Sequence, residues 1–140
     1  MILDFNLAEN LGGVCEHKPE LLEANTRDRI RGGLDISARA RDRTMARVEQ
    51  QRARLREVFH DYDALLTLAA PGEAPIGLNS TGNAVFSAIW TLMGVPTITL
   101  PMLEGENDLP IGVQIIGAKG EDAKLLAVAG KILKTHTDRP

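Results

Sequence analysis

Three short apolar segments limit most strongly how this chain can fold. They occupy residues 64–69, 97–100 and 111–116, with proline and glycine close to their ends. The first is a continuous apolar run without polar alternation, which is typical of a strand covered on both faces. Four helical patterns lie between and around the segments. The order α, α, β, α, β, β, α predicts an α/β fold with a small sheet flanked by helices.

The longest helical pattern covers residues 37–59 and starts at a serine suited to capping a helix N-terminus, Ser37. Apolar residues recur along it on one face, and arginines cover the remainder. These apolar residues are Met45, Val48, Leu55 and Phe59. A shorter helix is expected to open at Pro19 and to end at Gly32 and Gly33. Proline suits a first helical turn, and glycine favours helix ends.

Two further helices are expected in the second half of the chain. One is capped by Thr81 or Asn83 and ends at Gly94, because glycine readily adopts the left-handed conformation that closes a helix. The other begins near Glu121 and Asp122, whose negative charges complement the helix dipole.

The three predicted strands raise a problem of cover. Each is expected to need a layer on both faces, yet only three or four helices are available. Exposed strand edges also favour pairing with another chain. Either the layers are thin, or another chain or a further segment completes the sheet. A homodimer is therefore one expected assembly.

Arginine is concentrated in one part of the chain. Ten of the eleven arginines lie between residues 27 and 56, whereas residues 62–91 contain neither lysine nor arginine. A chain of 140 residues fits one domain. We therefore expect a single domain over 1–140, with a helical arginine-rich part over 19–60 and an α/β part over 61–135.

Charge and hydropathy argue against nucleic-acid and membrane partners. The formal net charge is −3, which predicts no general attraction to nucleic acid or acidic lipid. Arg39, Arg43 and Arg47 share a helical stripe that could bridge phosphates, but interleaved acids and the lack of stacking aromatics favour a solvated face. No apolar run approaches the roughly 20 residues of a membrane helix, and the first residues lack a signal-peptide pattern. With Cys15 as the only cysteine, a soluble, cytoplasmic protein is expected.

Residue types that carry chemistry are present, but their spacings define no site. A triad of Ser80, His60 and Asp63 has no spacing rule to support it, and Cys15 has no stronger support as a nucleophile. The histidines lack zinc-ligand spacing, and the glycines match neither a dinucleotide nor a phosphate loop. The residues alone therefore predict no catalytic group, no metal and no cofactor.

From residue 61 onward the sequence resembles the C-terminal region of the amidase signature family. The most specific phrase is Leu-Pro-Ile-Gly-Val-Gln over 109–114, followed by Gly117. Other matching words are Tyr-Asp-Ala-Leu-Leu-Thr over 62–67, Ala-Pro-Ile-Gly-Leu over 74–78, Ser-Thr-Gly-Asn over 80–83 and Gly-Val-Pro-Thr-Ile-Thr-Leu-Pro over 94–101. Residues 19–56 are similar in layout to the helices that precede this region in the family, and the first residues lack a counterpart.

The resemblance implies an α/β/α sandwich around a mixed sheet, of which this chain would form the C-terminal portion. It also implies hydrolysis of carboxamide C–N bonds by a Ser-Ser-Lys mechanism. The family's catalytic serines lie in a Gly/Ser-rich segment ahead of the matched region, and its lysine lies further upstream. No such segment occurs here, since neither pair of adjacent glycines leads into serines. The catalytic residues are therefore expected to be absent from this chain.

The same resemblance suggests which residues approach a substrate. In the family, the loop that matches residues 79–81 lies toward the substrate cleft, so Asn79, Ser80 and Thr81 are candidates for contacting a small-molecule amide. The simpler interpretation is that Ser80, Thr81 and Gly82 form a loop and helix cap, not a nucleophile turn.

Two functional interpretations remain open. In the first, the chain is the C-terminal segment of an amidase, inactive alone and completed by a complementary N-terminal amidase segment. In the second, it is a free-standing, non-catalytic binding or assembly module derived from the amidase fold. A segment should expose apolar surface, whereas an evolved module should form a defined oligomer.

Overall fold

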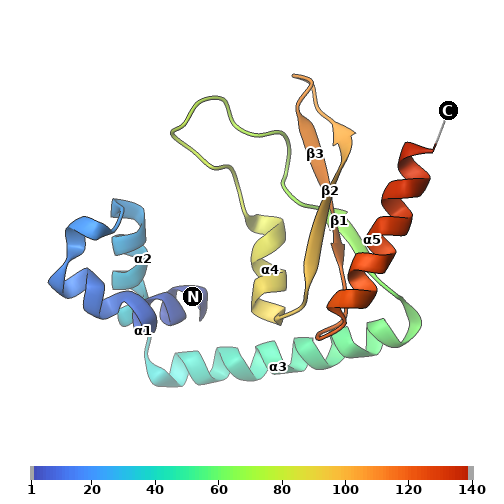
Figure 1. Ribbon diagram of the computed structural model, residues 1–140. Helices are drawn as coiled ribbons and strands as arrows, with labels where there is room; N and C mark the ends of the chain where they lie inside the picture. The colour runs from blue at the N-terminus through green and yellow to red at the C-terminus, as the bar shows by residue number, and fades with distance from the viewer. Residues whose placement is uncertain (1, 139–140) are drawn as a thin grey trace. The chain divides into compact units, whose positions relative to one another are not determined.

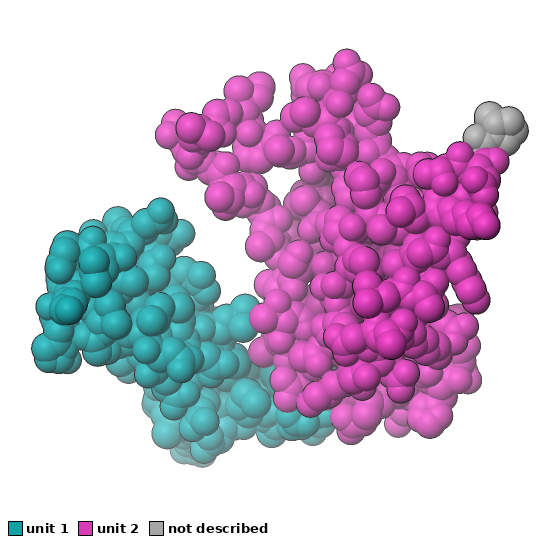
Figure 2. All heavy atoms as spheres, viewed as in Figure 1, with its two compact units in different colours: residues 1–51 teal, residues 52–140 magenta. Residues whose placement is uncertain are grey.

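The computed structural model describes residues 2–138 and divides into two compact units. Unit 1 covers residues 1–51 and unit 2 covers residues 52–140 (Figure 2). The described residues form five α-helices, one short 3-10 helix and three strands (Figure 1). None of these helices is long and apolar enough to cross a membrane. The expectation of one domain with parts over 19–60 and 61–135 stays a prediction.

Unit 1 consists of α1 (Ile2–His17), the 3-10 helix η1 (Pro19–Leu21), α2 (Ala24–Leu34) and the first part of α3 (Ala38–Asp61). α1 and α2 pack against each other. The buried apolar residues of these two helices are Ile2, Ala8 and Ile30. The sequence did not predict α1, because its apolar residues are spread around the helix and form no stripe.

The expectation that Gly32 and Gly33 end a helix is wrong, since both lie inside α2. A β-carbon at Gly33 would overlap the backbone carbonyl of Asp4 and the side chain of Ala8, both in α1. The missing side chain therefore allows close approach of two helices, which is a second use of glycine besides ending a helix. That use depends on a partner helix that the local sequence does not reveal.

The helix expected to start at Pro19 is also interrupted. Pro19 begins only the three residues of η1, Leu22 is extended, and α2 begins at Ala24. Arg27 donates hydrogen bonds from Nη1 to the carbonyl oxygens of Pro19 and Leu22. An α2 side chain thus takes up carbonyls that a continuous helix would have paired internally.

The long helix predicted over residues 37–59 is confirmed as α3. The Ser37 hydroxyl accepts a hydrogen bond from the N–H of Ala40 at 3.3 Å, as an N-terminal cap does. Within unit 1 the Arg41 guanidinium lies 4.9 Å from the centre of the Phe5 ring, a cation–π distance. This arginine therefore packs on its own chain.

Unit 2 is built on a three-stranded sheet with the order β1-β3-β2, and the α/β class is confirmed. The strands are β1 (Leu65–Leu68), β2 (Thr97–Glu104) and β3 (Pro110–Ile116). Both pairings are antiparallel, so the mixed arrangement implied by the resemblance is not found among the described strands. β2 and β3 are joined by a short turn, and a parallel pair would need a long crossover.

β2 is longer than the sequence predicted, because it continues through Pro101 to Glu104. Proline lacks the N–H that a central strand must donate, but β2 lies at an edge of the sheet. The register shifts between Pro101 and Leu103. The irregularity accommodates a residue that was expected to stop the strand.

Two helices flank the sheet of unit 2. α5 (Asp122–Thr137) packs against β2 and β3, and α4 (Val85–Met93) lies on the other side of the sheet (Figure 1). The core under α5 is formed by Leu100, Ile115, Leu125 and Ala129. α4 ends at Gly94 in the left-handed conformation, as predicted.

The cover over the sheet is incomplete at the β1 edge. Leu66 is opposite Ile115 in the register and therefore shares its face of the sheet. Ile115 is fully buried, whereas Leu66 is 61% exposed and Leu68 is 38% exposed. The two-sided cover expected of all three strands is thus not provided by the described residues.

Candidate functional site

The residues predicted to approach a substrate lie on the connection between β1 and α4, within unit 2. We call residues 69–84 the β1–α4 connection; it contains neither helix nor strand. Its first residue is fixed to the sheet, because the N–H of Ala69 donates to the carbonyl of Gly112 at 2.9 Å. The Ser87 hydroxyl of α4 also donates to the carbonyl of Ala69, at 3.4 Å.

A cavity of about 550 Å³ lies along this connection. Thr81 lines it with Asn83 and Ser87, whereas Asn79 and Ser80 are exposed and are not part of its lining. Most of the other lining residues are alanine, glycine and proline, and none is lysine or arginine. The cavity can therefore enclose a small group and offers hydroxyl and amide groups for hydrogen bonds.

Ser80 and Asn83 shape the backbone at the end of the connection. The Ser80 hydroxyl accepts a hydrogen bond from the N–H of Gly82 at 3.1 Å, and Gly82 has a φ of 88° that suits glycine. The Asn83 side-chain oxygen accepts from the N–H of Val85 at 3.0 Å. Of the two expected caps, Asn83 thus makes the bond at the start of α4, although Ala84 is the N-cap residue.

The triad drawn from Ser80, His60 and Asp63 finds no support in these contacts. The Asp63 carboxylate lies 2.7 Å from the ammonium of Lys124. Lys124 lowers the pKa of that carboxyl, first through the hydrogen bond and then through its charge. In the described residues no group of three or more histidine, cysteine, aspartate or glutamate side chains is arranged to hold a metal ion.

The β1–α4 connection is also held by a residue that the sequence did not single out. Both carboxylate oxygens of Glu73 accept hydrogen bonds from Asn107, one from the backbone N–H and one from the side-chain amide, each at 2.8 Å. Asn107 lies in the turn between β2 and β3. Gly105 leaves room for the carboxylate, since a β-carbon there would overlap it. The partners are 34 positions apart, so no local pattern could have revealed the contact.

Gln114 closes the most specific phrase of the sequence, but no role was assigned to it. Its side chain lies in the central strand and is 4% exposed, and its Oε1 has no hydrogen-bond partner in the described structure. The Nε1 of Trp90, in α4, is also buried and has no hydrogen-bond partner in the described structure. A buried polar atom left unpaired costs about 1–3 kcal/mol. Both atoms therefore mark positions where the fold tolerates a cost.

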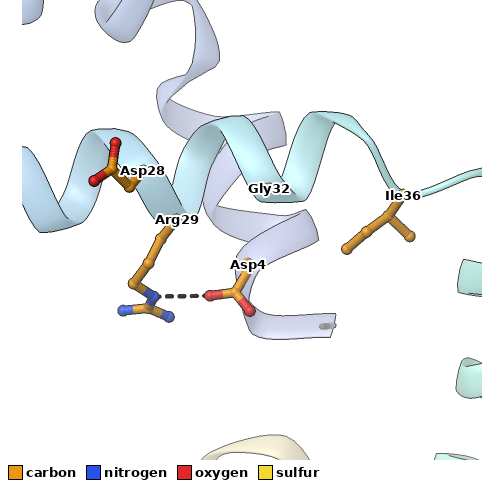
Figure 3. Close-up of a pocket in the computed structure, with 5 residues that line it drawn as sticks. All are labelled: Asp4, Asp28, Arg29, Gly32 and Ile36. Atoms are coloured by element: carbon orange, nitrogen blue, oxygen red, sulfur yellow. Dashed lines mark hydrogen bonds and ion pairs between the residues drawn. The ribbon is translucent and has the colours of Figure 1, made fainter.

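Unit 1 has a hollow of its own, of about 610 Å³ (Figure 3). It is lined by Asp4, Asp28, Arg29, Gly32 and Ile36. Arg29 Nε donates to a carboxylate oxygen of Asp4 at 2.7 Å, which joins α2 to α1. Among its described lining residues the hollow has a structural ion pair and no serine, cysteine or histidine.

These observations define an α/β protein in which a small antiparallel sheet supports a cavity walled by a long connection. The Amidase family model matches residues 15–126, and the chain belongs to this family. AmiB2 of Mycobacterium tuberculosis is 31% identical over 126 residues, which cover 81% of this chain and 27% of the relative. The 2-amino-5-chloromuconic acid deaminase of Comamonas testosteroni is 29% identical over 136 residues, covering 88% of this chain and 29% of the relative.

The three-dimensional structure is similar to known amidase structures as well. A crystal structure of an amidase superposes with a TM-score of 0.74 and 27% identity, over 94% of this chain and 33% of the other. The chain therefore spans about a third or less of the length of the proteins it matches.

Proposed function

We propose that this chain forms a cavity-lining C-terminal part of an amide-hydrolysing enzyme, and that a complementary N-terminal amidase segment supplies the Ser-Ser-Lys machinery. The observation that carries the proposal is the family match over residues 15–126, in a chain that covers only 27% of AmiB2. On this proposal the chain contributes part of the substrate site and has no hydrolase activity alone.

The serine contacts support a non-catalytic role for this part. The chain contains three serines, and each hydroxyl is hydrogen-bonded to the backbone: Ser37 to Ala40, Ser80 to Gly82, and Ser87 to Ala69. A serine nucleophile needs a base within hydrogen-bond reach to take its proton. No base is bonded to any of these three hydroxyls.

The β1 edge supports the need for a complementary segment. Leu66 and Leu68 are exposed on a sheet face whose centre is buried by α5. Fully burying a leucine side chain contributes about 1.5–3 kcal/mol. Covering these partly exposed leucines would therefore stabilise the association with another segment by part of that energy. An amidase segment that packs on this face of the sheet over β1 would cover both leucines.

The cavity favours an uncharged carboxamide. No cation is found among its described lining residues, and the carboxylate of Glu73 is already engaged by Asn107. A substrate carboxylate would therefore lose water without gaining a counter-charge from this wall. A neutral amide can instead exchange hydrogen bonds with Thr81, Asn83 and Ser87.

The experiment is a replacement of the matching region of an active host amidase by this chain. Release of ammonia from a panel of neutral amides is compared for the chain alone, the host lacking the region, and the chimera. We expect activity in the chimera only. Hydrolysis by the chain alone would contradict the proposal, and a folded but inactive chimera would contradict it as well.

A matched variant tests the role of the candidate serine. Ser80→Ala in the chimera should keep the maximal rate within a few-fold, because the hydroxyl serves the Gly82 turn and is not the nucleophile. A loss of all activity would show that the chemistry does reside in this chain.

The alternative is a free-standing assembly module. The exposed Leu66 supports this alternative if a second copy of the chain covers that side chain. Two measurements separate the alternatives. A species of 15.2 kDa in the native cells together with a monodisperse dimer in analytical ultracentrifugation would favour the module. A much heavier native species would favour the hydrolase part, and a monodisperse monomer would remove the basis for the dimer.

A further inference from the structure

We propose that Glu73 is a positioning residue: by binding Asn107, its carboxylate holds the β1–α4 connection against the β2–β3 turn and so fixes one wall of the substrate cavity. The inference rests on the proposed function, because the wall matters only if the cavity receives the amide. It assigns no chemistry to Glu73 itself.

The middle of the connection has no other attachment. Over residues 70–79, the two hydrogen bonds that Glu73 accepts from Asn107 are the only ones that join this segment to the rest of the described structure. Apolar packing does not replace them, since the large side chains of this stretch, Ile76 and Leu78, are fully exposed. Without Glu73, the connection would be fixed only at its two ends.

The receiving turn is well formed. The N–H of Gly105 donates to the carbonyl of Leu109 at 3.0 Å, and the N–H of Asp108 donates to the carbonyl of Gly105 at 3.3 Å. Asn107 sits inside this closed turn and directs both its donors to one carboxylate. An ionised carboxylate accepts on both oxygens, so the match of two donors and two acceptors is complete.

The position of Glu73 links the contact to the cavity. Glu73 and Gly72 line the cavity of about 550 Å³ and also a smaller one of about 340 Å³ beside the turn, which Gly105 and Asn107 line too. A shift of Glu73 therefore moves a shared wall. Losing the contact would leave the connection to be ordered by the substrate, which raises KM while the chemical step keeps its rate.

The pair can be inverted, which provides a sharp test. Glu73→Ala removes both acceptors. Asn107→Asp places two carboxylates together. Glu73→Gln introduced together with Asn107→Asp is the double variant, and it restores both bonds with the side-chain polarity reversed. A glutamine amide can donate to an aspartate, and its oxygen can still accept the backbone N–H. Glu106→Ala is the matched control, because Glu106 lies in the same turn next to Asn107, while the hydrogen bonds to the connection come from Asn107.

Two readouts are measured on each variant. The first is hydrogen exchange of the Asn107 amide, with NMR order parameters for residues 74–79, in the 140-residue chain. The second is KM and kcat in the chimeric amidase. Losing at least one hydrogen bond to a charged group should raise the amide exchange rate and KM by about tenfold or more in Glu73→Ala and in Asn107→Asp. The double variant should recover most of both losses, and kcat should stay within a few-fold throughout.

The outcomes separate the two proposals. Exchange at Asn107 unchanged by Glu73→Ala would overturn the contact itself, whatever the enzyme does. Exchange that rises while KM stays constant would overturn the positioning role, as would a double variant that recovers neither property. An inactive chimera with Glu73 intact would instead overturn the proposed function, and the positioning role would fall with it.

Discussion

Adjacent glycines in α2 provide a test of how unit 1 packs. Gly32 and Gly33 lie in the same helix, but their surroundings differ. A β-carbon at Gly32 would have no atom within 4 Å, whereas one at Gly33 would overlap the Asp4 carbonyl and crowd Ala8. Gly32→Ala and Gly33→Ala therefore make the same chemical change in open space and in a closed helix contact.

The magnitudes follow from two opposing effects. Alanine is favoured over glycine inside a helix by about 0.8–1 kcal/mol, so Gly32→Ala should raise the free energy of unfolding by about that amount. Gly33→Ala gains the same helix term but overpacks the α1 contact, which costs about 1–3 kcal/mol. The expected difference between the variants is therefore about 1–3 kcal/mol, with Gly33→Ala less stable.

Urea unfolding of the full chain, followed by circular dichroism, gives both free energies. Because the chain contains two compact units, hydrogen exchange of the α1 amides should report the change in unit 1 separately. Equal stability of the two variants would refute the close contact at Gly33. A loss of stability in Gly32→Ala would show that α2 ends before this residue, as the sequence alone suggested.

Three further predictions concern unit 2. Gly130 is exposed within α5, and a β-carbon there would meet open space. Gly130→Ala should therefore raise the free energy of unfolding by about 0.5–1 kcal/mol, seen as a higher urea midpoint. An unchanged midpoint would contradict this. Lys124 lowers the pKa of Asp63 below its ordinary 3.8. The pair therefore stabilises the fold above that pH, and this stabilisation is lost as the pH falls through the lowered pKa. Asp63→Asn should make the loss of stability at acid pH less steep when unfolding midpoints are measured against pH. Gln114→Met removes the unpaired Oε1 at similar volume and should stabilise by about 1 kcal/mol; a destabilised variant would show that the oxygen has a partner such as a buried water.

The elements that sequence reasoning located have local signals. The amphipathic pattern and the Ser37 cap identify α3 without knowledge of any partner. Gly94 adopts the left-handed conformation that its position after an apolar helix predicts. The apolar segments at 64–69 and 111–116 become β1 and β3 because a buried strand requires nothing more local than such a run.

α1 escaped prediction because its sequence lacks an apolar stripe, but other missed features are set by tertiary partners. Gly33 has the same local sequence whether it ends a helix or admits α1, and only the position of Asp4 decides between these uses. β3 likewise pairs antiparallel with β1 on one side and with β2 on the other. The sequences of the strands do not by themselves determine which strand is central.

The candidate site combines both kinds of information. Thr81 could be placed near the cavity from a family phrase that includes it, and the structure puts it in the lining. The shape of that lining, however, depends on Glu73 reaching Asn107 across 34 positions and on the lack of a side chain at Gly105, which leaves room for the carboxylate. Each of these residues is of a type that is common in loops. The cavity wall is defined only by the contact that they make in the fold. A family phrase can therefore indicate which loop borders a cavity, while the contact that shapes the loop has to be found in the fold and tested by inverting it.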